Sequence, residues 1–230
     1  MQRQRLNRIG HLALPIVGGM VSQVVLNLVD TAMVGVLGKE ALAGVGTASF
    51  ATFMATALVM GLSSGVQTMA ARRVGEGRGD EAAVPLNGGL LLALVIGLPM
   101  SIVLLAYSST LFPLINADQG VVDAGLPYFD ARLLGVVAVG MNFAFRGYWT
   151  GVSQSRRYLH TLLVIHVANI AISYVLIFGK FGFPEMGTEG SGLGTTISLY
   201  LGTLVYFALG WKEARKNGFL SRIPRRETMA

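Results

Sequence analysis

Six long apolar stretches constrain the fold of this 230-residue chain more than any other feature of its sequence. They lie near residues 12–37, 48–70, 87–107, 128–150, 159–179 and 191–211. Each is long enough to cross a bilayer, which takes about 20 residues of helix. Backbone polar groups must be satisfied internally in lipid, so such stretches predict helices. We therefore predict an all-α, polytopic membrane bundle of six transmembrane helices over residues 1–211. A basic tail, or the start of a linker, follows over residues 212–230.

The composition agrees with a membrane protein. Hydrophobic residues make up 53% of the chain and charged residues 13%, against about 25% charged residues in soluble proteins. The charged residues gather between the apolar stretches, whereas a soluble helical protein spreads them over its exposed helix faces. The chain has no cysteine, which excludes disulfide frameworks, thiolate metal sites and cysteine nucleophiles.

The distribution of Lys and Arg predicts the orientation in the membrane. Of 18 such residues, 14 lie before the first stretch or after the second, fourth and sixth stretches. Only Lys39 and Lys180 lie in the alternate connectors, and Arg132 and Arg146 lie within the fourth stretch. Cytoplasmic loops carry an excess of Lys and Arg, so we predict that both termini are cytoplasmic. This topology also accounts for the net charge of +6, and we expect no nucleic-acid partner.

The connectors and the spacing of glycines add local predictions. The longest connector, residues 108–127, contains two prolines and two aspartates, so we expect it on the surface. Gly61 and Gly65, and also Gly147 and Gly151, are four residues apart, a spacing that lets helix backbones approach closely. We expect these glycines to pack within the chain rather than to form a dimer.

One acidic residue, Asp30, lies well inside a predicted span. A carboxylate there costs about 2.5–3.5 kcal/mol on insertion scales, so it should face the bundle interior and have a partner. Gln23 and Asn27 precede it at positions that place all three side chains on one face of the first helix. This stripe favours a functional ion or proton site, and the alternative is a structural, hydrogen-bonded acid.

Two further polar stripes lie in the last two spans: His166, Asn169 and Ser173, and then Ser191, Thr195 and Ser198. If they converge on Asp30, their amide and hydroxyl oxygens would complete a site of the kind that a hard cation prefers. The Asp30 carboxylate, the Asn169 amide and the hydroxyls of Ser173, Ser191 and Thr195 would together make a cage for Na⁺. The carboxylate alone would serve if the coupling ion were a proton.

Two other polar residues are candidates for lining a cavity together with Gln23 and Asn27. His166 could relay protons, although a histidine hydrogen-bonded between helices is the commoner case. Asn142 lies on the same face of the fourth span as Arg146. The sequence shows no Ser-His-Asp set, no paired carboxylates and no metal-ligand cluster, so it does not support an enzyme or a resident cofactor.

Four segments resemble the multidrug and toxic compound extrusion (MATE) family. The segment LPIVGGMVSQVVLNLVDTAMVGVLGKEALAGVG at residues 14–46 is similar to the first helix of that family. The resemblance continues in order through AARRVGEGR (70–78), FRGYWTGVSQS (145–155) and NIAISYVLIFGKFGFPEMGTEGSGLGTT (169–196). The stretch FGKFGFPEMG is most similar to the NorM-like bacterial branch.

The resemblance implies a transporter in the bacterial inner membrane that exports small organic cations or other drugs in exchange for Na⁺ or H⁺. It places the acid of the coupling site at Asp30, the asparagine of the fifth helix at Asn169 and a small polar position at Ser191. Where the family often has Asp or Asn, this chain has Ser173, which leaves the choice between Na⁺ and H⁺ open. We expect Na⁺.

Family members are usually about twice this long, with two lobes of six helices each. The resemblance implies that this chain is the amino-terminal lobe and that a second six-helix lobe is its partner. We expect a truncated product or fragment, because the tail shows no feature that closes a bundle; the alternative is a half-size subunit. A lipid or polysaccharide-precursor flippase of the same architecture and a non-transporting membrane scaffold are the competing functions.

Overall fold

The structure, a computed structural model, describes the backbone of residues 2–221 and the side chains of residues 13–221. Its elements in chain order are α1 (Gln2–Gly35), α2 (Lys39–Met60), α3 (Leu62–Gly75), η1 (Gly79–Glu81), α4 (Val84–Ile115), α5 (Gln119–Leu133), α6 (Val136–Gly151), α7 (Ser155–Ile177), α8 (Gly187–Leu209), η2 (Gly210–Ala214) and η3 (Arg215–Asn217). The predicted all-α fold is confirmed, and the described residues contain no strand. The basic side chains of Arg3, Arg5, Arg8, Arg222, Arg225 and Arg226 lie outside the described residues.

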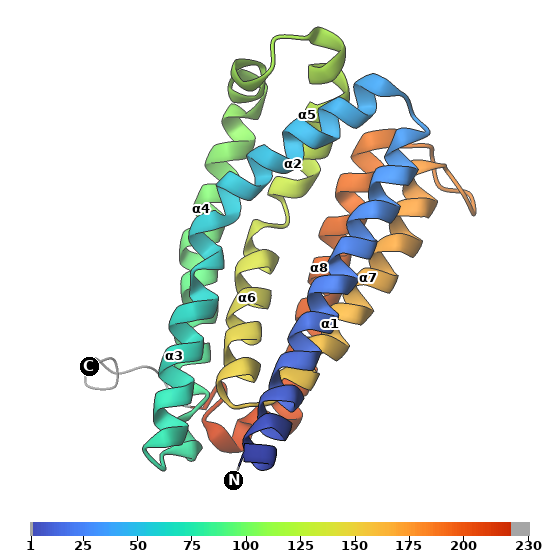
Figure 1. The fold of residues 1–230 in the computed structure, drawn as a ribbon. Helices are drawn as coiled ribbons and strands as arrows, with labels where there is room; N and C mark the ends of the chain where they lie inside the picture. Colours follow the sequence, from blue (N-terminus) through green and yellow to red (C-terminus); the bar gives the residue numbers. More distant parts are fainter. Residues whose placement is uncertain (1, 222–230) are drawn as a thin grey trace.

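The helices match the six predicted spans. Five helical stretches within the described residues are long and apolar enough to cross a membrane: Ala13–Gly35, Lys39–Gly75, Gly79–Ile115, Ser155–Ile177 and Gly187–Asn217. The pair α5 and α6, bent by 53°, meets the same criteria when it is counted as one span, which brings the number of candidate spans to six. In Figure 1, α1, α7 and α8 run side by side, and α2 to α6 form the rest of the bundle.

Residues 108–127, predicted as a surface connector, are exposed over most of 109–119 but are largely helical. Helix α4 continues to Ile115 and α5 begins at Gln119, so only three residues between them are outside a helix. The side chain of Asp118 caps α5 by accepting a hydrogen bond from the backbone N–H of Val121 at 3.1 Å. Pro113 and Pro127 lie inside helices, where the sequence pattern had suggested breaks.

The bend between α5 and α6 is stabilised by hydroxyl groups from neighbouring helices. A bend frees backbone carbonyls, which must find other donors inside a membrane. The hydroxyls of Ser101, Thr196 and Tyr200 donate to the carbonyls of Leu133, Ala131 and Leu134 at 2.7, 2.7 and 2.8 Å, respectively. The fourth span is therefore a bent helix pair held by α4 and α8.

The glycine predictions hold for one pair and fail for the other. A methyl group at Gly147 would collide with the backbone of Ser63 in α3, and one at Gly151 would come within 2.7 Å of the carbonyl oxygen of Gln67. These two glycines therefore let α6 and α3 approach closely within the chain. Gly65 has nothing within 4 Å of its added methyl group, so the pair Gly61 and Gly65 makes no such contact with another helix.

The first part of the predicted tail packs onto the bundle. Phe219 is 1% exposed and lies against the rings of Phe145 and Phe207, with centroids 5.8 and 6.0 Å away. The side chain of Asn87 in α4 donates to the carbonyl of Gly218 at 2.8 Å and accepts from the N–H of Leu220 at 3.0 Å. The prediction that no feature of the tail closes the bundle is thus wrong for residues 214–220.

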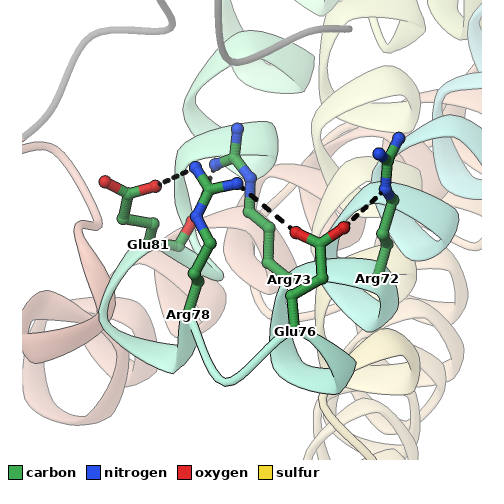
Figure 2. Close-up of polar contacts among 5 residues, drawn as sticks. All are labelled: Arg72, Arg73, Glu76, Arg78 and Glu81. Carbon is green, nitrogen blue, oxygen red and sulfur yellow. Dashed lines mark hydrogen bonds and ion pairs between the residues drawn. The ribbon is translucent and has the colours of Figure 1, made fainter.

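The turn between α3 and η1 carries a network of charges (Figure 2). Glu76 lies between two arginines: Arg72 Nε donates to it at 2.8 Å, and one terminal nitrogen of Arg78 lies 3.4 Å away. The other terminal nitrogen of Arg78 reaches Glu81 at 2.6 Å, and Arg73 donates to the backbone carbonyl of Glu81 at 2.8 Å. The hydrogen bond from Arg72 holds the pKa of Glu76 below its usual range.

Candidate functional site

Asp30 lies near the carboxyl end of α1 and is partly buried. Its Oδ1 atom is shielded from solvent and has no hydrogen-bond partner, and no hydrogen bond or ion pair joins Asp30 to another described residue. Arg132 of α5 is close enough for its charge to act on the Asp30 carboxylate. The arrangement leaves one carboxylate oxygen of the first span available to a ligand.

A hydrogen-bonded chain connects α1 to α7 through His166. The ring Nδ1 of His166 is 2.7 Å from the Ser22 hydroxyl, and its Nε2 is 3.2 Å from Oε1 of Gln23. Since Oε1 can only accept, we assign the proton to Nε2 and let Nδ1 accept from Ser22. Gln23 in turn donates to Oδ1 of Asn27 at 3.0 Å. Both ring nitrogens of His166 are therefore used between the helices, which supports the structural interpretation of this residue.

A second polar group joins α7 to α8. Asn169 is 1% exposed, and its Nδ2 donates to the Thr195 hydroxyl at 2.9 Å. That hydroxyl donates to the carbonyl of Ser191 at 3.1 Å. The Oδ1 of Asn169 and the hydroxyl of Ser173 are buried and have no hydrogen-bond partner. The predicted residues of these two helices thus come together and leave two oxygen atoms unsatisfied.

A glycine allows this close contact of α7 and α8. A methyl group at Gly194 would come within 2.8 Å of the backbone N and Cα of Ser173. Any residue larger than glycine would therefore push the two helices apart at the level of Ser173. The polar residues of α8 are recognisable in the sequence, but the role of this glycine between them is not.

Two of the predicted polar residues serve packing within the described structure. Asn142 donates to the carbonyl of Leu199 and accepts from the hydroxyl of Thr203, both at 3.0 Å, so it ties α6 to α8. Ser198 donates to the carbonyl of Gly194 in its own helix at 2.6 Å. Neither is hydrogen-bonded to the α1 group of Gln23 and Asn27.

The site can offer oxygen ligands from two helices, α1 and α7. Asp30, Asn169 and Ser173 each hold one buried oxygen without a partner, and such atoms cost about 1–3 kcal/mol each when nothing occupies them. No hydrogen bond joins Asp30 to Asn169 or to Ser191 within the described residues, and the Na⁺ cage of these residues stays a prediction. Within the described residues, no group of three His, Asp or Glu side chains could hold a metal ion.

Three contributors to these contacts were missed from the sequence. Ser22 and Thr203 looked like ordinary helix hydroxyls, which commonly bond back to their own backbone. Arg132 lies towards one end of the fourth predicted span, and nothing in the sequence indicated that the bend of this span brings its charge near Asp30. The position of Ser22, directly before Gln23 on a helix with few polar residues, was the one available signal.

Comparison with known proteins shows the family of the chain. The MatE family model matches residues 15–175. The chain is 31% identical over 210 residues to a probable multidrug resistance protein NorM of Synechococcus, covering 90% of this chain and 45% of that protein. It is 28% identical over 204 residues to a probable NorM of Neisseria meningitidis, covering 88% and 44%.

Solved structures show the same fold. A multidrug resistance MATE family transporter in an outward-facing conformation matches with a TM-score of 0.83 and 26% identity, over 96% of this chain and 49% of that one. A transporter of the same superfamily from Pyrococcus furiosus matches with a TM-score of 0.84 over the same shares. The chain thus spans about half the length of the relatives that it matches. The match of the family model over most of the chain shows that it belongs to the MatE family of multi-pass membrane transporters.

Proposed function

We propose that this chain forms the amino-terminal lobe of a cation-coupled exporter of drugs and other toxic compounds in the bacterial inner membrane. The observation that carries the proposal is the unpartnered Oδ1 of Asp30 inside an apolar span. A buried carboxylate without a protein partner is costly unless it binds a cation or a proton during function. The relatives named as multidrug resistance proteins support export as the direction of transport.

In the proposed mechanism, the lobe alternates between two conformations. Binding of the coupling ion at Asp30 changes the charge of the lobe, and this shifts its equilibrium toward a conformation that binds substrate weakly. The shift can be no larger than the difference in ion affinity between the two conformations. A second six-helix lobe would complete the substrate cavity, since this chain covers 45% of its NorM relative.

Substitution of Asp30 by Asn tests the coupling role. The amide keeps the shape of the side chain but cannot change charge, so we expect ion-driven export by the full two-lobed transporter to be lost while membrane insertion persists. Asp123→Asn is the matched control, because Asp123 is exposed on α5 and only bonded to Gln119, at 2.7 Å. Normal gradient-driven efflux in Asp30→Asn would refute the coupling role.

Sodium is the coupling ion that we propose. The free oxygens of Asn169 and Ser173, added to Asp30, provide the hard donors that Na⁺ prefers. Ser173→Asn replaces a hydroxyl by an amide oxygen, which is a stronger ligand for Na⁺. This change should raise the apparent affinity for Na⁺ without changing the range of substrates. Efflux from vesicles should run on an imposed Na⁺ gradient at equal pH. Transport that follows a pH gradient and ignores Na⁺ would favour the proton instead.

A further inference from the structure

Arg132 is the last residue but one of α5 and lies next to the bend of the fourth span. Its side chain is partly buried, and its Nε atom is shielded from solvent without a hydrogen-bond partner. Among the described residues, no hydrogen bond or ion pair joins the guanidinium to another side chain or to a backbone carbonyl. An arginine within a membrane span is costly and normally pairs with an acid or a carbonyl group, so Arg132 needs a partner.

Asp30 is the acid that matches Arg132. Arg132 is the one described residue whose charge acts on the Asp30 carboxylate. Helix α5 and the carboxyl end of α1 lie at the same end of the bundle in Figure 1. Asp30 also has a buried oxygen atom without a hydrogen-bond partner. The bundle thus holds two opposite charges within electrostatic reach of each other that do not form an ion pair.

Helix α8 places Arg132 at the level of the coupling residues. The Thr196 hydroxyl donates to the carbonyl of Ala131 at 2.7 Å, which fixes the backbone directly before Arg132. The neighbouring residue of α8, Thr195, accepts the hydrogen bond of Asn169 at 2.9 Å. Successive residues of α8 therefore contact the end of α5 that carries Arg132 and the buried amide of α7. This contact places Arg132 near the coupling site independently of any argument from charge.

Tyr128, one turn before Arg132 on α5, gives the guanidinium a position away from Asp30. The Cζ atom of Arg132 lies 6.0 Å from the centre of the Tyr128 ring, at the outer limit of a cation–π interaction. The Tyr128 hydroxyl accepts a hydrogen bond from Ser49 of α2 at 3.2 Å, which holds the ring in place. Such a contact is weak compared with a buried pair of arginine and carboxylate, so the guanidinium can leave the ring.

We propose that Arg132 is a tethered competitor of the coupling ion, which pairs with Asp30 when no ion is bound and returns to Tyr128 when the ion binds. This inference rests on the proposed coupling role of Asp30. A bare carboxylate inside a membrane is costly, so a cation of the protein that takes the place of the departing ion makes its release easier. Arg132 acts through Asp30 and is not itself a ligand of the ion. Because it adjoins the bend between α5 and α6, the exchange also moves a charge at that bend.

The first test measures the Na⁺ affinity of the full two-lobed transporter, reconstituted in vesicles at constant pH. The Na⁺ concentration that gives half-maximal efflux is determined for Arg132→Gln, which removes the charge, and for Arg132→Lys, which keeps it. Arg146→Gln is the matched control, because Arg146 lies toward the other end of the same span. Its guanidinium lies over the rings of Phe143 and Tyr158, 5.6 and 5.1 Å from their centres.

We expect Arg132→Gln to lower the half-maximal Na⁺ concentration about tenfold, the order expected for loss of one nearby charge in a membrane interior. Its maximal rate of efflux should fall, because the ion then leaves a bare carboxylate behind. Arg132→Lys should stay within about threefold of the original protein, since the competing charge is kept. Arg146→Gln should leave the Na⁺ dependence unchanged. If Arg132→Gln does not transport, its Na⁺ affinity is measured from thermal stabilisation by Na⁺ instead.

A double-mutant cycle separates pairing from a merely structural role of Arg132. Thermal unfolding is compared for the original protein, Asp30→Asn, Arg132→Gln and the double variant, first with choline in place of Na⁺ and then at saturating Na⁺. The two changes should be non-additive without Na⁺ and additive with it, because Asp30 holds Arg132 only when no ion is bound.

The possible failures are distinguishable. An unchanged Na⁺ dependence in Arg132→Gln, an equal effect of Arg146→Gln, or additive changes without Na⁺ would overturn the competition and leave the coupling role of Asp30 in place. Ion-driven efflux that persists in Asp30→Asn would instead refute the coupling role itself.

Discussion

Replacing Gly147 by Ala should destabilise the bundle, whereas the same change at Gly65 should not. Both glycines belong to pairs spaced by four residues, and both lie in helices. Alanine is favoured over glycine in a helix by about 1 kcal/mol, so the propensity gain is the same for both changes. The difference between them therefore measures packing against the neighbouring helix.

The packing cost follows from the contacts of the added methyl group. At Gly147 it would lie 3.0 Å from the carbonyl carbon and 3.1 Å from the Cα of Ser63, and closer still to the carbonyl oxygen. Carbon atoms prefer about 3.5–4.0 Å, and a backbone cannot rotate out of the way as a side chain can. Overpacking of this kind typically costs about 1–3 kcal/mol. After the propensity gain, we expect a net loss of up to about 2 kcal/mol in Gly147→Ala, as compared with a gain of up to about 1 kcal/mol in Gly65→Ala.

Unfolding in mixed detergent and SDS micelles measures this difference. The chain has two tryptophans, and Trp149 is 1% exposed one turn or less from Gly147, so its fluorescence reports loss of the α3–α6 contact. A Gly147→Ala protein that resists SDS as well as Gly65→Ala does would show that α3 and α6 are not in the close contact described.

Three further outcomes follow from the structure. Phe219→Ala should lower the free energy of unfolding by about 3–5 kcal/mol, as for other buried Phe side chains. The control Leu220→Ala should lower it by less than about 0.5 kcal/mol, because Leu220 is 54% exposed. Equal effects of the two changes would contradict the packing of the tail. Because the pKa of Glu76 is lowered in the folded protein, its contribution to stability is present above its unfolded value of 4.5 and is lost as the pH falls through the folded value. Glu76→Gln should therefore remove part of the fall in melting temperature that thermal unfolding shows between about pH 5 and pH 3. An unchanged fall would show that the pair of Glu76 and Arg72 does not contribute to it. A cysteine at Asp118 should react with an impermeant reagent added outside intact cells and one at Gly77 only after permeabilisation, and the reverse pattern would invert the predicted topology.

The sequence predicted the fold class and the spans because those depend on length and hydrophobicity alone. The apolar stretches are as long as a bilayer crossing needs, and five of them fall largely within single helical stretches of the structure, whereas the fourth falls on the bent pair α5 and α6. The connectors were less predictable. Pro113 and Pro127 favour breaks in isolated helices, but neighbouring helices supply the packing and hydrogen bonds that keep α4 and α5 helical.

The contacts between helices were harder to predict, because the periodicity of the sequence does not show which helix faces meet. Gly147 and Gly65 have the same spacing pattern, yet only Gly147 faces another backbone. Phe219 lies in a segment that looks like a polar tail, but its ring fills a gap between Phe145 and Phe207. In the same way, the stripes of α7 and α8 were placed on the correct helices, but the role of Gly194 was visible only once Ser173 lay opposite it.

The distribution of unsatisfied atoms connects the sequence pattern to the proposed function. Buried polar atoms in native proteins almost always have a partner, so each exception needs an explanation. Among the described residues, seven buried side-chain atoms lack one, and three of these are oxygens of Asp30, Asn169 and Ser173. All three belong to the five residues, with Ser191 and Thr195, that the sequence analysis predicts for ion coupling. Structural polar residues of the bundle, such as His166 of α7 and Asn142 of α6, have hydrogen-bond partners on neighbouring helices. If these polar residues served helix packing alone, Asp30, Asn169 and Ser173 would have hydrogen-bond partners as His166 and Asn142 do. The difference favours a ligand, Na⁺ in our proposal, that binds the free oxygens of the first three residues during transport.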